Sequence, residues 1–125
     1  METRPKIIYL AGKMTGLDDL GRAQFFEKAC ELEKLGHIVL NPGALPIGLP
    51  GFSYMPICTA MIDAADCIYM MFGWYESEGA QLELAYAKYQ GKDVIFEVEH
   101  VEDELFLGKS LDNYILYGKD GKDVL

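Results

Sequence analysis

The chain has 125 residues, half of them hydrophobic, and a formal net charge of −9 at neutral pH. One compact domain over residues 1–125 is expected, because two separate cores would each lie near the lower size limit of a stable fold. The acidic balance argues against polymeric nucleic acid as the main partner, since neutralising its phosphates needs clustered Lys and Arg.

The cysteines and histidines exclude further classes of protein. Three cysteines, an odd number without paired metal-ligand spacing, indicate a reducing cytoplasm rather than a disulfide framework. His37 and His100 lie far apart and flank strands, so we expect no metal and no organic cofactor. The N-terminal residues lack the long apolar stretch of a signal peptide or membrane span, and a cytoplasmic protein without a membrane partner is therefore expected.

Strand-like and helix-like patterns alternate along the chain. Continuous apolar runs predict buried strands at residues 7–11, 37–40, 67–72 and 94–96. Helical periodicity, with glycine or proline at the boundaries, predicts helices at residues 22–35, 55–65 and 77–90. This order predicts an α/β fold, a Rossmann-like or flavodoxin-like three-layer sandwich with a mostly parallel sheet of four or five strands. Residues 111–117 are expected to add an edge strand or an oligomer contact.

The apolar residues at helical spacing identify the faces expected to pack on the sheet. In the first helix these residues are Phe25, Phe26, Ala29, Leu32 and Leu35. In the last helix they are Leu82, Ala85, Tyr86 and Tyr89, and Ser77 is expected to cap this helix.

Ligands of such folds bind beyond the carboxyl ends of the parallel strands, which directs attention to the loops there. The loop Gly12–Gly16 could hold a phosphate with backbone N–H groups, Lys13 and Thr15, or it could be a simple turn with a solvated lysine. It matches neither common glycine-rich nucleotide motif. Residues 41–53, rich in proline and glycine, form a long irregular loop that is expected to lie over a site.

Glu83 follows the third predicted strand, about a turn and a half into the last helix. Gly79 precedes it by four residues, so a ligand could rest on bare backbone between Glu83 and the helix N-terminus. Tyr9 at the first strand could donate a hydrogen bond to the carboxylate, and Trp74 could stack on a planar base. By position alone, Glu83 could equally be an ordinary glutamate at the boundary of the core stripe.

Three segments together resemble the nucleoside 2-deoxyribosyltransferase-like superfamily, and in particular its small bacterial and phage members. They are Tyr9–Gly16, Gly36–Pro42 and the pattern Gly73-Trp74-x-x-Ser77-x-Gly79-Ala80-x-x-Glu83. The resemblance spans residues 6–98, and its most specific part is Ser-x-Gly-x-x-x-Glu.

The resemblance implies chemistry at a glycosidic carbon, without a cofactor. Glu83 would attack the anomeric carbon of a 2-deoxyribosyl group, and Tyr9 would orient the carboxylate. The sugar-phosphate end would be held by Gly12, Lys13, Thr15 and Ser77. A serine at the place of Ser77 favours a monophosphate substrate. Relatives are commonly homo-oligomers, dimers or larger, in which neighbouring subunits close the site.

One residue departs from the pattern. Many active relatives carry an aspartate eight residues before the position of Asp66, where this chain has Cys58. Asp63 could substitute, although the spacing turns it away from Cys58, and Asp66 itself is expected to order the strand entrance.

Three hypotheses about function follow. The first is an enzyme of nucleotide metabolism, a transferase or a hydrolase (N-glycosidase), that cleaves or exchanges the N-glycosidic bond of a (deoxy)nucleoside or its 5′-monophosphate. The alternative is a non-catalytic nucleotide-binding module of the same fold. The third is an oligomerising structural protein, because Tyr114 and Tyr117 lie in the tail.

Overall fold

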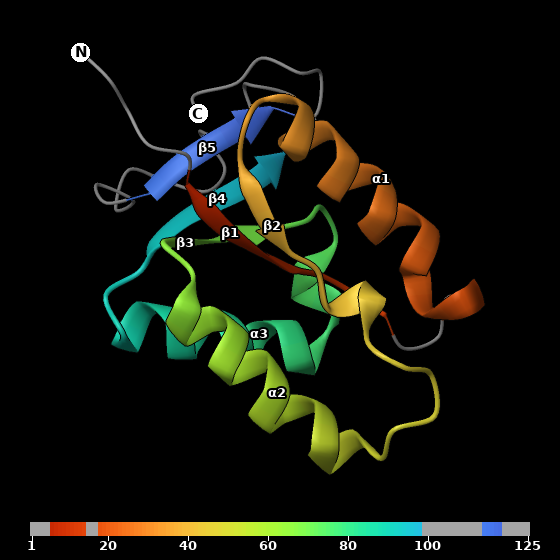
Figure 1. Ribbon diagram of the computed structural model, residues 1–125. Coiled ribbons are helices and arrows are strands. Elements are labelled where there is room, and N and C mark those ends of the chain that lie inside the picture. The colour runs from red at the N-terminus through yellow and green to blue at the C-terminus, as the bar shows by residue number, and fades with distance from the viewer. Residues whose placement is uncertain (1–5, 15–17, 99–113, 119–125) are drawn as a thin grey trace.

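The computed structural model describes residues 6–14, 18–98 and 114–118, with positions 18, 20, 98 and 114–118 as backbone only. Within these ranges, the strands are β1 (Ile7–Ala11), β2 (Ile38–Leu40), β3 (Cys67–Met70), β4 (Asp93–Val98) and β5 (Tyr114–Gly118). They form one sheet in the order β2-β1-β3-β4-β5, and all neighbouring strands are parallel (Figure 1). The predicted flavodoxin-like α/β fold is therefore confirmed. The edge strand predicted near residue 111 is β5, and positions 111–113 lie outside the described residues.

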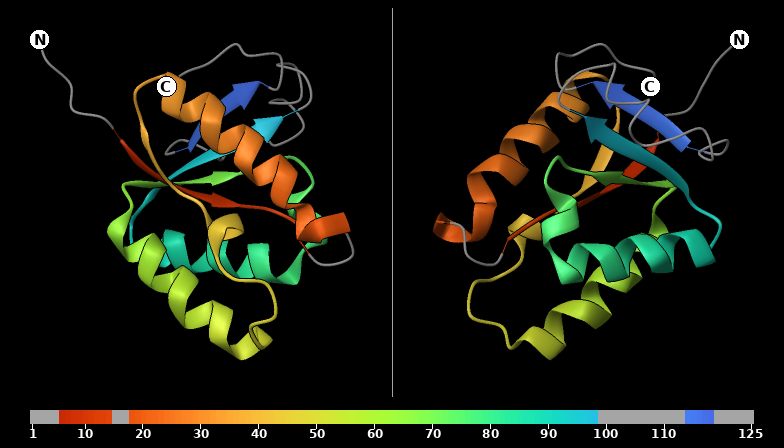
Figure 2. Two further views of the ribbon diagram at one scale, coloured as in Figure 1. Left: turned by 45° about the vertical axis from the view of Figure 1, so that its right-hand side comes forward. Right: turned by 180° about the vertical axis from the view of Figure 1, so that it is seen from behind.

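Helices cover both faces of the sheet. The three α-helices of the described chain are α1 (Arg22–Lys34), α2 (Gly51–Ala64) and α3 (Glu78–Tyr89). Helix α1 lies on one face, and α2 and α3 lie together on the other (Figures 1 and 2). Because successive strand residues point to opposite faces, Ile8 and Leu10 pack with α1, whereas Tyr9 and Ala11 pack with α2 and α3. This alternation fixes the face toward which Tyr9 points.

The core stripe predicted for α3 was wrong in part. The buried residues of this helix are Ala80, Leu84 and Ala87, whereas Leu82 and Tyr89 are 60% and 88% exposed. Small alanines face inward because α3 packs against both the sheet and α2, so size was a poor guide to burial. Glu83 consequently lies beside the buried face, one residue before Leu84 and three after Ala80.

The prediction was also wrong for two residues of the α1 stripe, which are exposed rather than buried. Phe25, Ala29 and Leu32 are buried as expected, but Phe26 and Leu35 are each 48% exposed. The buried face has room for Lys28 instead, whose ammonium group forms a 2.8 Å ion pair with Glu97 of β4 and a 2.9 Å pair with Glu31. Phe26 lies at the surface, where the Arg22 guanidinium group lies over its ring at 5.9 Å from the centroid.

Helix α2 begins at Gly51, four residues earlier than the predicted start at Met55. The loop predicted at residues 41–53 is correspondingly shorter and contains the short 3₁₀ helix η2 (Pro42–Ala44). Pro56 lies within the first two turns, where the carbonyl group that loses its N–H partner is near the helix end.

The two ends of the sheet have different roles. At the entrance to β3, the Asp66 carboxylate accepts a 2.7 Å hydrogen bond from the Ile7 N–H, which orders this edge as predicted. At the carboxyl ends of the strands, the connection after β1 leads to β2 on one side, and the connection after β3 leads to β4 on the other side. The two connections therefore run in opposite directions from neighbouring strands. Open α/β sheets bind ligands in the crevice at such a switch in strand order.

Candidate active site

A cavity of about 780 Å³ is lined by residues at the carboxyl ends of β1 and β3. Its walls are the end of β1 with residues 12–14, the loop at 42–49, the first half of α2 and residues 76–83. The volume is in the range of small-molecule binding sites. The loop that was expected to lie over a site does line this cavity.

The loop wall is fixed by hydrogen bonds to two of the surrounding helices. The Arg22 guanidinium group of α1 donates to the Leu45 carbonyl oxygen at 2.8 Å. The Tyr54 hydroxyl group of α2 donates to the Pro46 carbonyl oxygen at 2.7 Å. These two contacts hold the loop against the cavity.

The start of α3 forms the floor of the cavity. The Ser77 hydroxyl oxygen accepts a 3.1 Å hydrogen bond from the Ala80 N–H, so Ser77 is the N-cap, as predicted. Gly79 and Glu83, one turn apart, both line the cavity. The position of a Cβ atom at Gly79 is open, since the nearest atom is the Ser77 hydroxyl oxygen at 3.8 Å.

Tyr9 and Glu83 are joined inside this cavity. The Tyr9 hydroxyl group donates a 2.9 Å hydrogen bond to Oε2 of Glu83, although 74 positions separate the two residues in the chain. Tyr9 is fully buried between helices on a central strand, and its ring has little freedom to move. The hydrogen bond from Tyr9 therefore holds the carboxylate in one orientation.

Burial changes the acidity of Glu83. Removal of the carboxylate from water raises its pKa from 4.5 to about 7, even though hydrogen bonding by Tyr9 and Cys58 lowers the pKa. The same burial, with the nearby charge of Glu83, raises the pKa of Tyr9 well above 10, so Tyr9 stays a neutral donor. A carboxylate with this pKa is more basic and more nucleophilic than a surface glutamate.

Cys58 completes the immediate surroundings of the carboxylate. It is buried, lines the cavity and interacts with both Tyr9 and Glu83. Burial raises the pKa of its thiol to about 11, with a further increase from the charge of Glu83. The thiol is therefore protonated at neutral pH and is not a nucleophile there.

Lys13 lines the cavity but is paired with a neighbouring carboxylate. Its ammonium group lies 3.3 Å from Oε1 of Glu76, which belongs to the 3₁₀ helix η3 (Trp74–Glu76). Glu76 and Glu78 also line the cavity. The mouth near Lys13 thus carries more negative than positive charge among the described residues.

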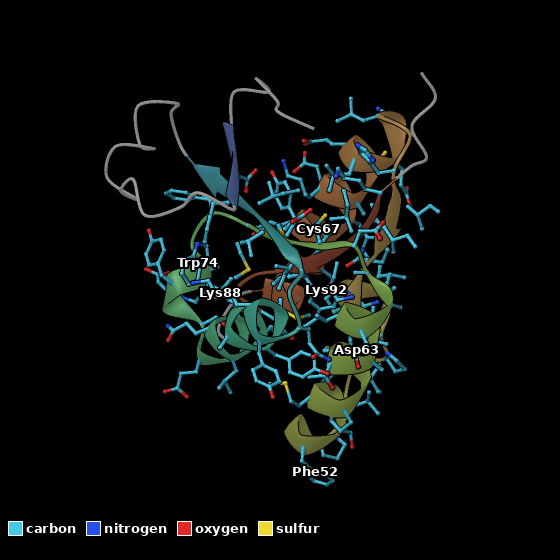
Figure 3. All side chains as sticks on the ribbon, turned by 90° about the vertical axis from the view of Figure 1, so that its left-hand side faces the viewer. Phe52, Asp63, Cys67, Trp74, Lys88 and Lys92 are labelled. Atoms are coloured by element: carbon cyan, nitrogen blue, oxygen red, sulfur yellow. The ribbon has the colours of Figure 1, made fainter. Side chains whose placement is uncertain are left out.

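The remaining predicted site residues are not all brought together. Gly12 lines the cavity with Lys13, and Thr15 lies outside the described residues. Asp63 and Trp74 do not line the cavity, and Figure 3 shows them far apart in the molecule. The Asp63 carboxylate accepts hydrogen bonds from Tyr86 (2.7 Å) and Gln90 (2.8 Å), and the Trp74 ring packs at 5.6 Å from that of Phe96.

The sequence analysis singled out Cys58 on α2 but missed three other cavity residues of this helix, Gly51, Tyr54 and Met55. All four follow the spacing of one helical face. This periodicity could have been seen had the helix start been placed at Gly51. Glu76 and Glu78 were also missed, because no local pattern indicates that they line the cavity or that Glu76 pairs with Lys13.

Substituting Gly79→Ala should separate stability from binding. The added methyl group meets no atom closer than 3.8 Å, and alanine is the better helix former, so the melting temperature should stay or rise slightly. The same methyl group occupies the floor of the cavity and should weaken ligand binding about tenfold. Thermal denaturation and ligand titration measure the two effects, and a clear fall in melting temperature would contradict the open position assigned to this Cβ atom.

The described residues contain neither a metal-binding cluster nor a helix able to span a membrane. No group of three or more His, Cys, Asp and Glu side chains in these ranges is placed to hold a metal ion. Likewise, none of the helices described here combines the length and apolar character that crossing a membrane requires.

The fold and site define a flavodoxin-like α/β protein with a partly buried carboxylate in a cavity at the switch in strand order. The chain belongs to the family described as a domain of unknown function, DUF4406, whose model matches residues 6–96. That match takes in all the cavity residues named above. A comparison with curated proteins finds no match.

Proposed function

We propose that the protein cleaves or exchanges the N-glycosidic bond of a nucleoside or its 5′-monophosphate, with Glu83 as the nucleophile. The observation that carries this proposal is the hydrogen bond from the buried Tyr9 to Glu83 inside a cavity large enough for a nucleoside. A carboxylate held by a neutral donor at one orientation is what attack on an anomeric carbon requires.

In the proposed reaction, an oxygen atom of Glu83 forms a bond to C1′ of the sugar. The bond between C1′ and the base nitrogen breaks, and the base leaves with the electron pair and takes a proton from solvent. Water or a second base then attacks C1′ and gives up a proton to solvent, and the glycosyl–glutamate ester breaks with return of the carboxylate. Hydrolysis and base exchange share the intermediate and differ in the acceptor that reaches it.

The resemblance to the nucleoside 2-deoxyribosyltransferase-like superfamily supports this reaction through the same residues. Tyr9 and Glu83 match its orienting tyrosine and its nucleophile, and the two side chains are in contact here. The cavity also offers a largely apolar wall for a planar base, made by Leu49, Tyr54 and Met55.

The second candidate is a nucleotide-binding module without catalysis. It is favoured by Cys58, because a protonated thiol of pKa about 11 is a poor substitute for the aspartate that many relatives carry near the leaving base. In that case the cavity would retain a nucleotide, and Glu83 would help to bind it.

Chromatography of free base distinguishes the two candidates. The purified protein is incubated with the deoxynucleosides and their 5′-monophosphates, with and without a second free base. We expect release of base, and formation of a new nucleoside if the enzyme is a transferase. Binding without any release over a long incubation would favour the non-catalytic module instead.

A further inference from the structure

The mouth of the cavity carries an arrangement of charges that bears on the ligand. Lys13 and Glu76, which form the 3.3 Å ion pair, line it together with Glu78. Both glutamates are exposed residues that line the cavity, so their side chains face any group that enters there.

The position of this mouth relative to Glu83 follows from the geometry of α3. Glu83 lies four positions after Gly79 in the helix, a rise of about 6 Å. A sugar whose C1′ atom lies at Glu83 and whose ring extends toward the helix N-terminus therefore places its C5′ end near Ser77, Lys13 and Glu76. The base then lies toward the apolar wall that Leu49, Tyr54 and Met55 form.

We propose that Glu76 is a specificity-determining residue, which pairs with Lys13 and so makes the cavity select uncharged nucleosides over their 5′-monophosphates. This inference rests on the proposed function, because it places the sugar by the attack of Glu83. A 5′-phosphate would meet one lysine that is already paired and two carboxylates of its own sign. The Ser77 hydroxyl group could still donate to the phosphate, but its oxygen is engaged as the helix cap.

The size of the effect can be estimated from the charges. A phosphate with two negative charges about 6 Å from one carboxylate is repelled by an amount equal to about tenfold in affinity, even at the dielectric constant of water. Salt reduces this repulsion, so the selectivity should be largest at low ionic strength.

The test measures binding rather than turnover. Isothermal titration of the four common deoxynucleosides and their 5′-monophosphates compares the wild type with Glu76→Gln and with Glu33→Gln, an exposed residue of α1 outside the cavity. We expect the wild type to prefer the nucleoside and Glu76→Gln to bind the monophosphate about tenfold more tightly than the wild type does, with nucleoside affinity unchanged. Lys13→Gln added to Glu76→Gln should remove that gain.

Other results would distinguish failure of the role of Glu76 from failure of the proposed function. A wild type that prefers the monophosphate, or a Glu33→Gln variant that gains as much as Glu76→Gln, would overturn the role of Glu76 and leave the proposed function standing. Selective nucleoside binding without release of base would support the role of Glu76 and contradict the proposed chemistry. Absence of binding to every one of these ligands would overturn both.

Discussion

Glu83→Gln should lower base release at least about a thousandfold, because glutamine cannot form the glycosyl ester and no other described carboxylate accepts the hydrogen bond of Tyr9. The amide keeps the size of the side chain and an oxygen for Tyr9, so the cavity should keep its shape. Rates of base release by the two purified proteins measure the effect. A glutamine variant with wild-type turnover would exclude Glu83 as the nucleophile.

Glu83→Gln should also make the protein more stable than the wild type at alkaline pH. Burial raises the pKa of Glu83 from 4.5 to about 7, so the folded state binds this proton more tightly than the unfolded state does. The contribution of Glu83 to the free energy of unfolding is therefore greatest below pH 4.5, and it falls as the pH rises to about 7. The ionised carboxylate costs at most about 3 kcal/mol above that pH.

Urea denaturation at pH 5 and pH 8 measures this cost. Glu83→Gln should gain stability over the wild type at pH 8 and little at pH 5, whereas Glu33→Gln on the exposed face of α1 should match the wild type at both. Loss of stability at pH 8 would show that the carboxylate contributes to folding, contrary to its desolvated position. A site residue that destabilises the fold is common where function needs a buried charge.

The pH dependence of kcat/KM should rise through an inflection near pH 7. Attack requires the ionised form of Glu83, whose pKa is raised by burial to about 7 in the free protein. Below that pH the rate should fall about tenfold per pH unit, since kcat/KM reports the ionisations of the free enzyme. Measurement of base release between pH 5 and 9, within the range in which the protein stays folded, tests this.

Tyr9→Phe provides the matched comparison for this profile. The hydroxyl group of Tyr9 lowers the pKa of Glu83, so its removal should move the inflection to higher pH and slow the reaction on both sides of it. A profile of the variant with an unchanged inflection would mean that the ionisation belongs to another group. A flat profile of the wild type would contradict Glu83 as the ionising nucleophile.

Much of the fold could be predicted because hydrophobic periodicity is local. The strand at Ile7–Ala11, the stop at Gly36 and the cap at Ser77 are all where the sequence placed them. The faces of the helices were harder, since Phe26 and Tyr89 are large and apolar and yet lie at the surface. Burial depends on how closely a helix approaches the sheet, and on α3 the alanines allow the close approach.

For the candidate site too, some residues could be predicted from the sequence and others could not. Gly12, Lys13, Ser77, Gly79 and Glu83 follow strands β1 and β3, so strand order alone brought them to one edge of the sheet. Asp63 and Trp74 do not line the cavity, because their positions depend on the direction in which a helix or a loop turns its side chains. Asp63 pairs instead with α3, and Trp74 packs on β4.

The sequence by itself determined the order of strands and helices along the chain and the end of the sheet at which the cavity lies, because both follow from patterns within about twenty neighbouring residues. Only the tertiary structure decided that Tyr9 meets Glu83 across 74 positions, that Cys58 lies beside them and that Lys13 pairs with Glu76. The physical reason is that desolvation and ion pairing depend on distances between separate elements. Those distances, which set the pKa of Glu83 and the charge of the mouth, are fixed only when the helices pack on the sheet.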